Sequence, residues 1–418
     1  MAAVSAYIPL LALAAVLVVI AARKIGHFPV RIWQAMTGGA LLVLLTGAIT
    51  PAEALRAIEP DVMVFLFGMF VLGEALVESG ALYAVAYAML DRIRSTDALV
   101  FALLFGSALA SALLMNDTLA VIGTALALQL AREHRIDARL LLLTLAFGIT
   151  IGSVASPIGN PQNLLIAVRG PVPSPFLTFA GALAVPTLLN LLLTYGVLRW
   201  RYRDAFHRTP LVHPVVTLRD AALARLAWTG VAVVVAVIAL RAAIVILEPD
   251  FDVPLSTVAL AGALPVLLFS PRRGHVVRSL DWSTLVFFAA MFVLMASVWQ
   301  TGVLQHLGTG WAPQLAGPFG VLGVSVLVSQ FISNVPLVAL YLPYLQSLQA
   351  GTPALLALAA GSTIAGNLLI LGAASNVIII QRAERHGETL GFVEFARVGI
   401  PVTCINLLVY ALYLRNFI

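Results

Sequence analysis

Four short polar stretches interrupt an otherwise strongly apolar sequence, and they contain the residue types that suit recognition of a small solute. The stretches are Asn116-Asp117-Thr118, Gly159-Asn160-Pro161-Gln162-Asn163, Ser333-Asn334 and Ser375-Asn376. Irregular backbone at membrane depth must line a cavity or be buried in protein, because unpaired backbone groups are costly in hydrocarbon. We therefore predict that these amide and hydroxyl side chains form a solute-binding site.

The second stretch has the chemistry of a helix start, since Asn160 is a good N-cap and Pro161 needs no amide hydrogen at the first helical position. We expect Ser375-Asn376 to start a matching half-helix, and residues 116–118 and 333–336 to start helices at two hairpin tips. Helix N-termini carry about half a positive charge and free amide donors, so four converging N-termini would hold an anion without a buried Arg. The alternative is that Pro and Gly merely kink two helices.

Two acidic residues lie inside proposed membrane segments. A charge at the bilayer centre costs about 2.5–3.5 kcal/mol, so such residues usually have a role. Asp117 would bind a proton or a sodium ion at a hairpin tip; the alternative is a helix cap. Glu74 would relay protons, or be a protonated structural group bonded to a neighbouring helix.

The composition predicts a membrane protein. Of the 418 residues, 61% are hydrophobic and 10% charged, whereas a soluble domain carries about 25% charge. The net charge of +5 does not indicate nucleic acid, because the basic residues lie in short loops that would contact the inner leaflet. The single cysteine, Cys404, excludes an intrachain disulfide. No Walker A, HExxH or GxSxG motif is present, so we predict no enzyme, no cofactor and no metal site.

The sequence contains an internal repeat at an offset of about 213–223 residues. Residues 59–72 align with 281–294, which places Gly80 on Gly302, and residues 176–199 align with 392–415. Between them, residues 148–166 lie over 361–379. We therefore divide the chain into a first repeat (1–201), a linker (202–222) and a second repeat (223–418).

The predicted fold is an all-α polytopic membrane protein of two inverted repeats. Each repeat is expected to contain three spanning helices, a re-entrant hairpin, a broken helix and a final helix. The expected hairpins are 98–132 and 317–348, and the expected broken helices are 139–168 and 354–381. Five crossings in each half would invert the second repeat, which is typical of secondary transporters.

The distribution of positive charge agrees with this topology. Of the 24 Lys and Arg residues, all but Arg56, Arg169, Arg241 and Arg415 fall on one side. The positive-inside rule then predicts that both termini lie outside a bacterial or archaeal cytoplasmic membrane and that the 199–225 connection lies inside.

The polar motifs resemble those of the ion transporter superfamily, which includes arsenite efflux permeases (ArsB), NhaD-type sodium/proton antiporters and divalent-anion/sodium symporters. The resemblance covers nearly the whole chain and is strongest to the bacterial anion-permease branch. It implies scaffold and transport domains, two re-entrant hairpins, elevator movement and a homodimer. The chain departs from the symporters, whose hairpin tips read Ser-Asn-Thr, and it lacks the lysine expected of arsenite permeases within 361–379.

These observations predict a cation-coupled secondary active transporter of a small anion or oxyanion. The predicted substrate contacts are Asn116, Thr118, Gly159, Asn160, Pro161, Gln162, Asn163, Ser333, Asn334, Ser375 and Asn376, with Asp117 and Glu74 as ion-coupling residues. A proton is favoured over sodium as the coupling ion. The alternatives are an arsenite/antimonite efflux permease, a sodium/proton antiporter and, from another class, a passive channel or structural membrane protein.

Overall fold

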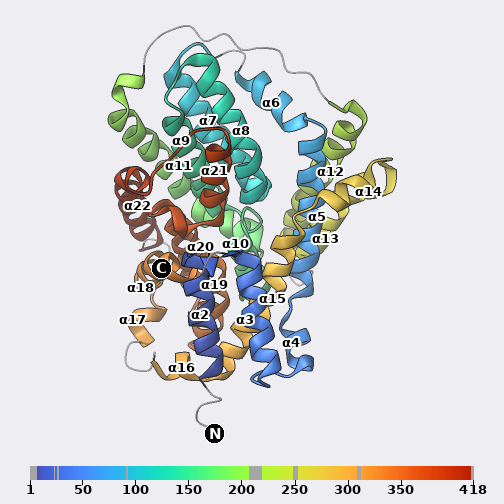
Figure 1. Cartoon of the computed structure of the whole chain (residues 1–418), viewed down its shortest axis with the longest axis vertical. Coiled ribbons are helices and arrows are strands. Elements are labelled where there is room, and N and C mark those ends of the chain that lie inside the picture. Colours follow the sequence, from blue (N-terminus) through green and yellow to red (C-terminus); the bar gives the residue numbers. More distant parts are fainter. Residues whose placement is uncertain are drawn as a thin grey trace.

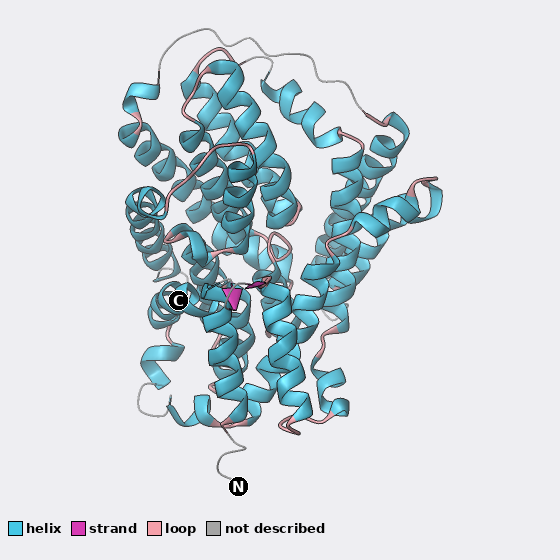
Figure 2. Ribbon diagram, in the orientation of Figure 1, coloured by secondary structure: helices cyan, strands magenta, loops and turns pink. Residues whose placement is uncertain are grey.

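The computed structural model describes residues 7–22, 24–25, 28–90, 93–206, 219–247, 253–307 and 312–415. Its described elements are helices, apart from a two-residue antiparallel pairing of β1 (Lys24–Ile25) with β2 (Phe28–Pro29) (Figure 2). Of the predicted linker (202–222), residues 207–218 lie outside the described residues.

Within its described residues, the first half of the chain forms ten α-helices and two 3₁₀ turns. In chain order they are α2 (Ile8–Ala22), α3 (Ile32–Leu45), α4 (Pro51–Ala57), α5 (Pro60–Glu78), α6 (Ala81–Leu90), α7 (Thr96–Leu113), α8 (Asn116–His134), α9 (Ala138–Gly152), η1 (Ser153–Ala155) and α10 (Pro161–Arg169), followed by the long α11 (Pro175–Arg201) and the turn η2 (Arg203–Ala205).

The second half repeats this order. Its elements are α12 (Ala221–Leu247), α13 (Leu255–Phe269), α14 (Arg273–Ser279), α15 (Trp282–Gln300), α16 (Val303–Leu307), α17 (Ala312–Ala316), α18 (Pro318–Ile332), α19 (Asn334–Ser347), α20 (Thr352–Ile364), η3 (Ala365–Asn367), η4 (Ile370–Gly372), α21 (Ala374–Arg385) and α22 (Phe392–Arg415). Gly80 and Gly302, which the repeat alignment equates, both have left-handed backbone, with φ of +75° and +73°. Only glycine adopts such a conformation readily, and in both halves it separates a long helix from a short one.

The helices group into two bodies. The first, which we call the scaffold, comprises α2–α5 and α12–α15; within it α5 packs on α13 and, equivalently, α3 packs on α15. Close approach of α5 and α13 depends on small residues, because a Cβ at Gly68 would lie only 2.7 Å from the carbonyl oxygen of Ala259. These pairs cross between the repeats, so each half of the chain needs the other to complete the scaffold.

The second body, which we call the hairpin body, comprises α7–α11 and α18–α22. The α7–α8 and α18–α19 hairpins pack on the broken helices, with α7 against α9 and α18 against α20. Each half-helix contacts the hairpin of the other repeat, α10 lying on α19 and α21 on α8. Helix α9 forms the centre: every residue from Ala138 to Gly152 except Arg139 is buried.

The two bodies lie side by side with the scaffold helices α5 and α12–α15 on one flank (Figure 1). We name the ends of the molecule by their short helices: the α4 end also holds α16 and α17, and the α6 end lies opposite (Figure 1). Among the described residues, seven helices are long and apolar enough to cross a membrane, and α2, α3, α13 and α18 are shorter apolar helices. The chain is a multi-pass membrane protein, and the predicted fold class is confirmed.

The structure also contains short helices that the sequence analysis did not predict. Helices α4 and α14 each precede a long scaffold helix, while α6, α16 and α17 follow one. Helix α5 ends before Gly80, whose left-handed backbone separates it from α6.

Candidate functional site

The first broken helix has the helix start that the sequence predicts. The side chain of Asn160 accepts a hydrogen bond from the backbone N–H of Asn163 at 2.9 Å, and Pro161 occupies the first helical position of α10. Pro suits this position because a first-turn N–H has no partner within the helix. The prediction that Asn160 caps this half-helix is confirmed.

The side chain of Asn163 holds the irregular backbone that precedes α10. Its amide nitrogen donates to the carbonyl oxygens of Ser153 and Ser156, both at 3.0 Å. Gly159 lets this segment approach the first hairpin, since a Cβ there would lie 2.7 Å from the carbonyl oxygen of Ser111. Asn160, Pro161, Gln162 and Asn163 are all buried, so in this conformation they build the break in the helix and do not line an open cavity.

The tip of the first hairpin is tied to the same break. Ser111 donates to Asn116 Oδ1 at 2.5 Å, and Asn116 Nδ2 donates to Ser153 Oγ at 3.3 Å. The backbone N–H of Asn116 donates to Gly159. The expectation that residues 116–118 start a helix is confirmed, since α8 begins at Asn116. The alternative reading of Asp117 as a helix cap is wrong, because Met115 occupies the N-cap position and no side chain caps α8.

Asp117 and Thr118 lie in the first turn of α8, facing the scaffold. Thr118 packs against α5, where a Cβ on Gly73 would lie 2.9 Å from Thr118 Cγ2. Asp117 is half-buried and makes no hydrogen bond or ion pair with any residue in the described part of the chain. It lies within electrostatic range of Asp281, the N-cap residue of α15.

Thr363 of α20 joins the two repeats at the centre of the site. Its hydroxyl accepts from Asn160 Nδ2 at 3.2 Å and from Gln162 Nε2 at 3.4 Å, and it lies 3.3 Å from Asn163 Oδ1, to which it donates. The sequence analysis did not identify Thr363, Ser111 or Ser153. Ser and Thr in apolar helices are common, so only the symmetric alignment of the two breaks would have drawn attention to them.

The second broken helix differs from the prediction at its start. Helix α21 begins at Ala374, and its N-cap residue Ala373 has no side chain that can cap it. Ser375 and Asn376 fall in the first turn instead, because Asn376 Nδ2 reaches back to the carbonyl oxygen of Gly366 at 2.5 Å. At the second hairpin tip, Ser333 is the N-cap residue of α19 with φ of +67° and makes no side-chain cap, and Asn334 is buried at the first helical position.

Polar atoms around this second break have unused hydrogen-bonding capacity. Gln330 Nε2 donates to the carbonyl oxygen of Ala365 at 2.9 Å, but its Oε1 atom has no partner in the described structure. The same holds for the buried Oδ1 atoms of Asn334 and Asn376 and for Thr150 Oγ1, which lies near Gly366. Buried polar atoms are normally paired. The first break is therefore internally satisfied, whereas the second offers polar atoms to a further group.

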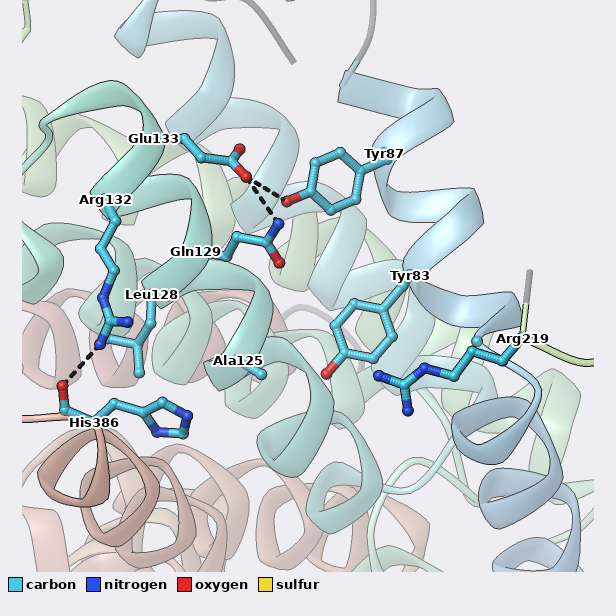
Figure 3. Close-up of a pocket in the computed structure, with 10 residues that line it drawn as sticks. Tyr83, Tyr87, Ala125, Leu128, Gln129, Arg132, Glu133, Arg219 and His386 are labelled. Atoms are coloured by element: carbon cyan, nitrogen blue, oxygen red, sulfur yellow. Dashed lines mark hydrogen bonds between the residues drawn. The ribbon is translucent and has the colours of Figure 1, made fainter. Parts of the chain in front are cut away.

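A cavity of about 530 Å³ separates α6 from α8 at the α6 end (Figure 3). Arg132 donates to the carbonyl oxygen of His386 at 2.8 Å, and Glu133 accepts from Gln129 at 2.8 Å and from Tyr87 at 3.4 Å. Burial, with Glu133 beside the ring, raises the pKa of Tyr87 above its ordinary range, so this hydroxyl stays a donor. Arg219 points towards the cavity and has no ion-pair partner in the described part of the chain. The lining therefore contains two arginines and one glutamate.

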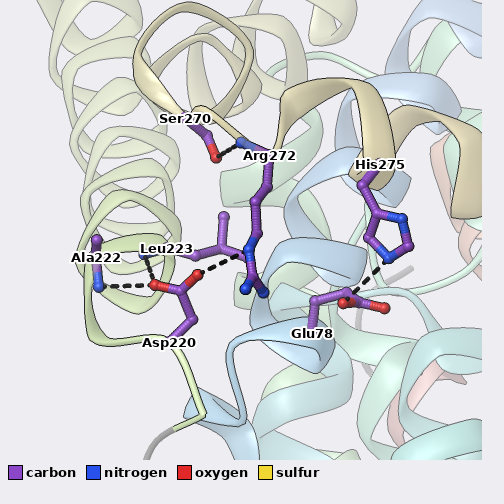
Figure 4. Close-up of polar contacts among 7 residues, drawn as sticks. All are labelled: Glu78, Asp220, Ala222, Leu223, Ser270, Arg272 and His275. Atoms are coloured by element: carbon purple, nitrogen blue, oxygen red, sulfur yellow. Dashed lines mark hydrogen bonds and ion pairs between the residues drawn. The ribbon is translucent and has the colours of Figure 1, made fainter.

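Glu74 follows Gly73 on α5 and is half-buried between the hairpin tip and the α6 end. It lies within electrostatic range of Glu78, His275 and Arg382. Glu78 itself pairs with His275 at 3.4 Å inside the scaffold, where Arg272 also pairs with Asp220 at 3.3 Å (Figure 4).

One ion pair connects the two bodies at the α4 end. Arg169, the last residue of α10, lies 2.8 Å from Glu59, the N-cap residue of α5. The Arg139–Glu394 pair, by contrast, lies within the hairpin body, at 3.4 Å. No cluster of three or more His, Cys, Asp or Glu residues that could hold a metal ion occurs within the described ranges.

Comparisons with known proteins agree with these features. Residues 15–354 match the family described as "CitMHS: Citrate transporter". An uncharacterized transporter of Mycobacterium tuberculosis is 31% identical over 404 residues, covering 91% of this chain and 92% of that protein. An uncharacterized transporter of Synechocystis is 26% identical over 419 residues, covering 90% of each. The crystal structure of the YdaH transporter of Alcanivorax borkumensis, described as having an unusual topology, matches 98% of this chain with a TM-score of 0.59 and 17% identity.

Proposed function

The chain belongs to the CitMHS citrate transporter family, and from this premise we propose that it is a cation-coupled secondary active transporter of a small anion. The observation that carries the proposal is the pair of broken helices, each packed against the hairpin of the other repeat inside a body separate from the scaffold. In transporters, discontinuous helices of this kind bind substrate and coupling ions near the membrane midplane.

We propose a carboxylate or oxyanion as the substrate. The N-terminus of α21 has no side-chain cap and carries partial positive charge, which suits such groups. Asn334, whose buried Oδ1 atom has no partner among the described residues, can turn its amide N–H₂ towards an anion instead. The cavity beside Arg132 and Arg219 would admit the anion from the α6 end. The family description makes citrate the first solute to test.

Movement of the hairpin body along the scaffold completes the proposal. The main contacts between the bodies are those of α5 with α8 and α10, of α15 with α19 and of α11 with α12. Such an interface permits the rigid-body sliding of an elevator mechanism. The α6 end would face the cytoplasm, in keeping with its arginine-rich connections, and both termini would lie outside a bacterial cytoplasmic membrane. A homodimer, with the scaffold as its interface, belongs to the same proposal.

Asp117 is the proposed coupling residue, with a proton as the coupling ion and sodium as the alternative. Its carboxyl group lies at the moving hairpin tip and has no ion-pair partner among the described residues. An intramembrane carboxyl of this kind is typically functional. Glu74, on the scaffold, is the proposed relay, and no resident cofactor is required.

The test is uptake into proteoliposomes carrying an imposed proton gradient, with and without sodium. The solutes are citrate, C4-dicarboxylates, sulfate, phosphate and arsenite. The expected result is proton-driven accumulation of one carboxylate or oxyanion, lost in Asp117→Asn while downhill exchange of the same solute continues. Glu74→Gln should slow proton-driven uptake, whereas Glu78→Gln, which alters a pair inside the scaffold, should not.

Other outcomes would assign the protein differently. Transport of arsenite alone would favour an efflux permease, and proton–sodium exchange without solute movement would favour an antiporter. Passive flux of solute that no gradient drives would overturn the proposal of a secondary active transporter.

A further inference from the structure

The ion pair between the two bodies has an unpaired counterpart related by the internal repeat. Glu59 is the N-cap residue of α5, and the repeat alignment places it on Asp281. Asp281 is the N-cap residue of α15, the second-half equivalent of α5. The two carboxylates therefore occupy the same position in the two halves of the scaffold.

The two arginines are equivalent in the same way. Arg169 lies nine positions after Asn160, the N-cap residue of α10. Arg382 lies nine positions after Ala373, the N-cap residue of α21. We call Arg169 with Glu59 the α4-end pair, and Arg382 with Asp281 the α14-end pair.

Only the α4-end pair is formed in this structure. Arg169 and Glu59 are 2.8 Å apart, and Gln346 donates to the backbone carbonyl of Arg169 at 2.6 Å. Asp281 instead accepts from Thr284, and Arg382 lies within electrostatic range of Glu74 and Tyr83. Within the described part of the chain, Arg382 and Asp281 form no ion pair with each other.

A cavity between α6 and the hairpin body lies at the end where the pair is open. The cavity of about 530 Å³ separates α6 from α8 and from His386, which follows α21. A second cavity of about 540 Å³ near Arg169 is lined by hairpin-body residues alone and does not separate the bodies. The two bodies are thus connected by an ion pair at the α4 end, whereas a cavity is open at the α6 end.

We propose that the two pairs are alternating latches: the α4-end pair closes in the present conformation, and the α14-end pair replaces it when the hairpin body moves to the opposite end. In transporters with inverted repeats, the inward-open and outward-open states exchange the environments of the two repeats. A contact that one repeat makes in one state is therefore made by the equivalent residues of the other repeat in the other state. This inference rests on the proposed alternating movement. In this proposal, the four residues of the two pairs determine which conformation is favoured, and none of them contacts the start of a half-helix.

The energetics suit a reversible latch. Arg169 and Glu59 retain 35% and 21% of their side-chain exposure, and such partly exposed pairs contribute modestly. Because each state contains one of two similar ion pairs, their contributions to the free-energy difference between the states nearly cancel. Neither state is then strongly favoured over the other. Loss of one pair should shift the populations of the two states by about two- to fivefold.

The test measures the accessibility of the cavity between α6 and the hairpin body. The full chain carries Cys404→Ser and Ala125→Cys, which places a single thiol on α8 in the cavity lining. The protein is reconstituted in nanodiscs without solute and labelled with a hydrophilic maleimide. Glu59→Gln should slow labelling about two- to fivefold, and Asp281→Asn in the Glu59→Gln background should return the rate towards its original value.

The substitutions are chosen to leave the helix starts intact. Glu59 makes no side-chain cap on α5, and Asn at 281 can keep the cap that Asp281 gives α15. Glu394→Gln is the matched control, because it breaks an ion pair inside the hairpin body and should leave the rate unchanged. Restored labelling in the charge swap Glu59→Arg/Arg169→Glu would further support the α4-end latch.

If Glu59→Gln and Asp281→Asn shift labelling in the same direction, or if neither shifts it, the alternating latches are refuted. Since no solute is present, this failure is distinct from a failure to transport an anion. Conversely, opposite shifts in a protein that transports no anion would support the latches and refute only the proposed substrate.

Discussion

Thr118 lies directly against Gly73, so the tip of the first hairpin contacts α5 at a position that has no side chain. A Cβ on Gly73 would lie 2.9 Å from Thr118 Cγ2 and 3.0 Å from Thr118 Oγ1. The absence of a side chain at Gly73 thus allows this close contact, and in the proposed movement it would let the hairpin tip pass along α5.

Gly73→Ala should slow transport about tenfold without unfolding the protein. The added methyl group overpacks the contact with Thr118, which typically costs about 1–3 kcal/mol, while alanine improves helix propensity. Initial uptake rates in proteoliposomes and thermal unfolding in detergent would measure the two effects. Thr118→Ser, which removes the crowded methyl, should recover much of the rate.

Gly181→Ala on α11 is the control for this substitution, since nothing lies within 4 Å of a Cβ there. Equal losses in the two alanine variants would mean that the contact with Thr118 is irrelevant to transport.

Thr363→Val should destabilise the hairpin body by about 1–3 kcal/mol, because it leaves the buried amides of Asn160 and Gln162 without their shared acceptor. A lowered thermal unfolding midpoint would report the loss. Thr144→Val is the comparison: Thr144 is also buried, but its hydroxyl bonds only to Leu140 within α9. A smaller effect is expected there, and the opposite ranking would contradict the role of Thr363 in joining the repeats.

Arg219→Gln should weaken anion uptake mainly at low substrate concentration, since it removes a positive charge from the cavity lining and leaves the broken helices untouched. We expect KM to rise severalfold while the maximal rate is nearly unchanged. The difference should shrink at high ionic strength, because salt screens exposed charges. A fall in the maximal rate with an unaltered KM would place Arg219 outside the entry path.

Low pH should destabilise helix α4. Hydrogen bonds from the side chain and the backbone N–H of Thr50 lower the pKa of Glu53 below its ordinary value. A carboxyl group with a depressed pKa stabilises the fold fully above its unfolded pKa of about 4.3, and that contribution disappears as the pH falls through the lowered value. Amide hydrogen exchange in Pro51–Ala57, corrected for intrinsic rates, should therefore accelerate below about pH 4. Glu53→Gln should lose this pH dependence.

Much of the fold could be predicted from sequence because lipid imposes simple rules. The length of the apolar runs indicated the long helices, and the internal repeat indicated that the order of elements is the same in both halves. The alignment of Gly80 with Gly302 corresponds to equivalent turns in the structure. The N-cap role of Asn160 followed from local chemistry that needs no tertiary information.

The contacts across the repeats could not be predicted in this way. Nothing in the sequence near Thr363 indicates that it meets Asn160, and the inward turn of Asn116 depends on Ser111 and Ser153 from other segments. Ala373 is the N-cap residue of α21 although it has no capping group, because tertiary packing overrides local preference. The ion pair of Arg169 with Glu59 likewise depends on the relative position of two bodies.

The exchange of partners between the halves also bears on biosynthesis. Helix α5 packs on α13, α3 on α15 and α10 on α19, so each of these first-half helices has its partner in the part of the chain that is translated later. Until α13 and α15 have been translated and inserted, the surface around Gly68 faces lipid or the insertion machinery. The first-half scaffold helices α3 and α5 therefore lack their main packing partners until the second half is made, whereas α7, α8 and α9 can already pack together.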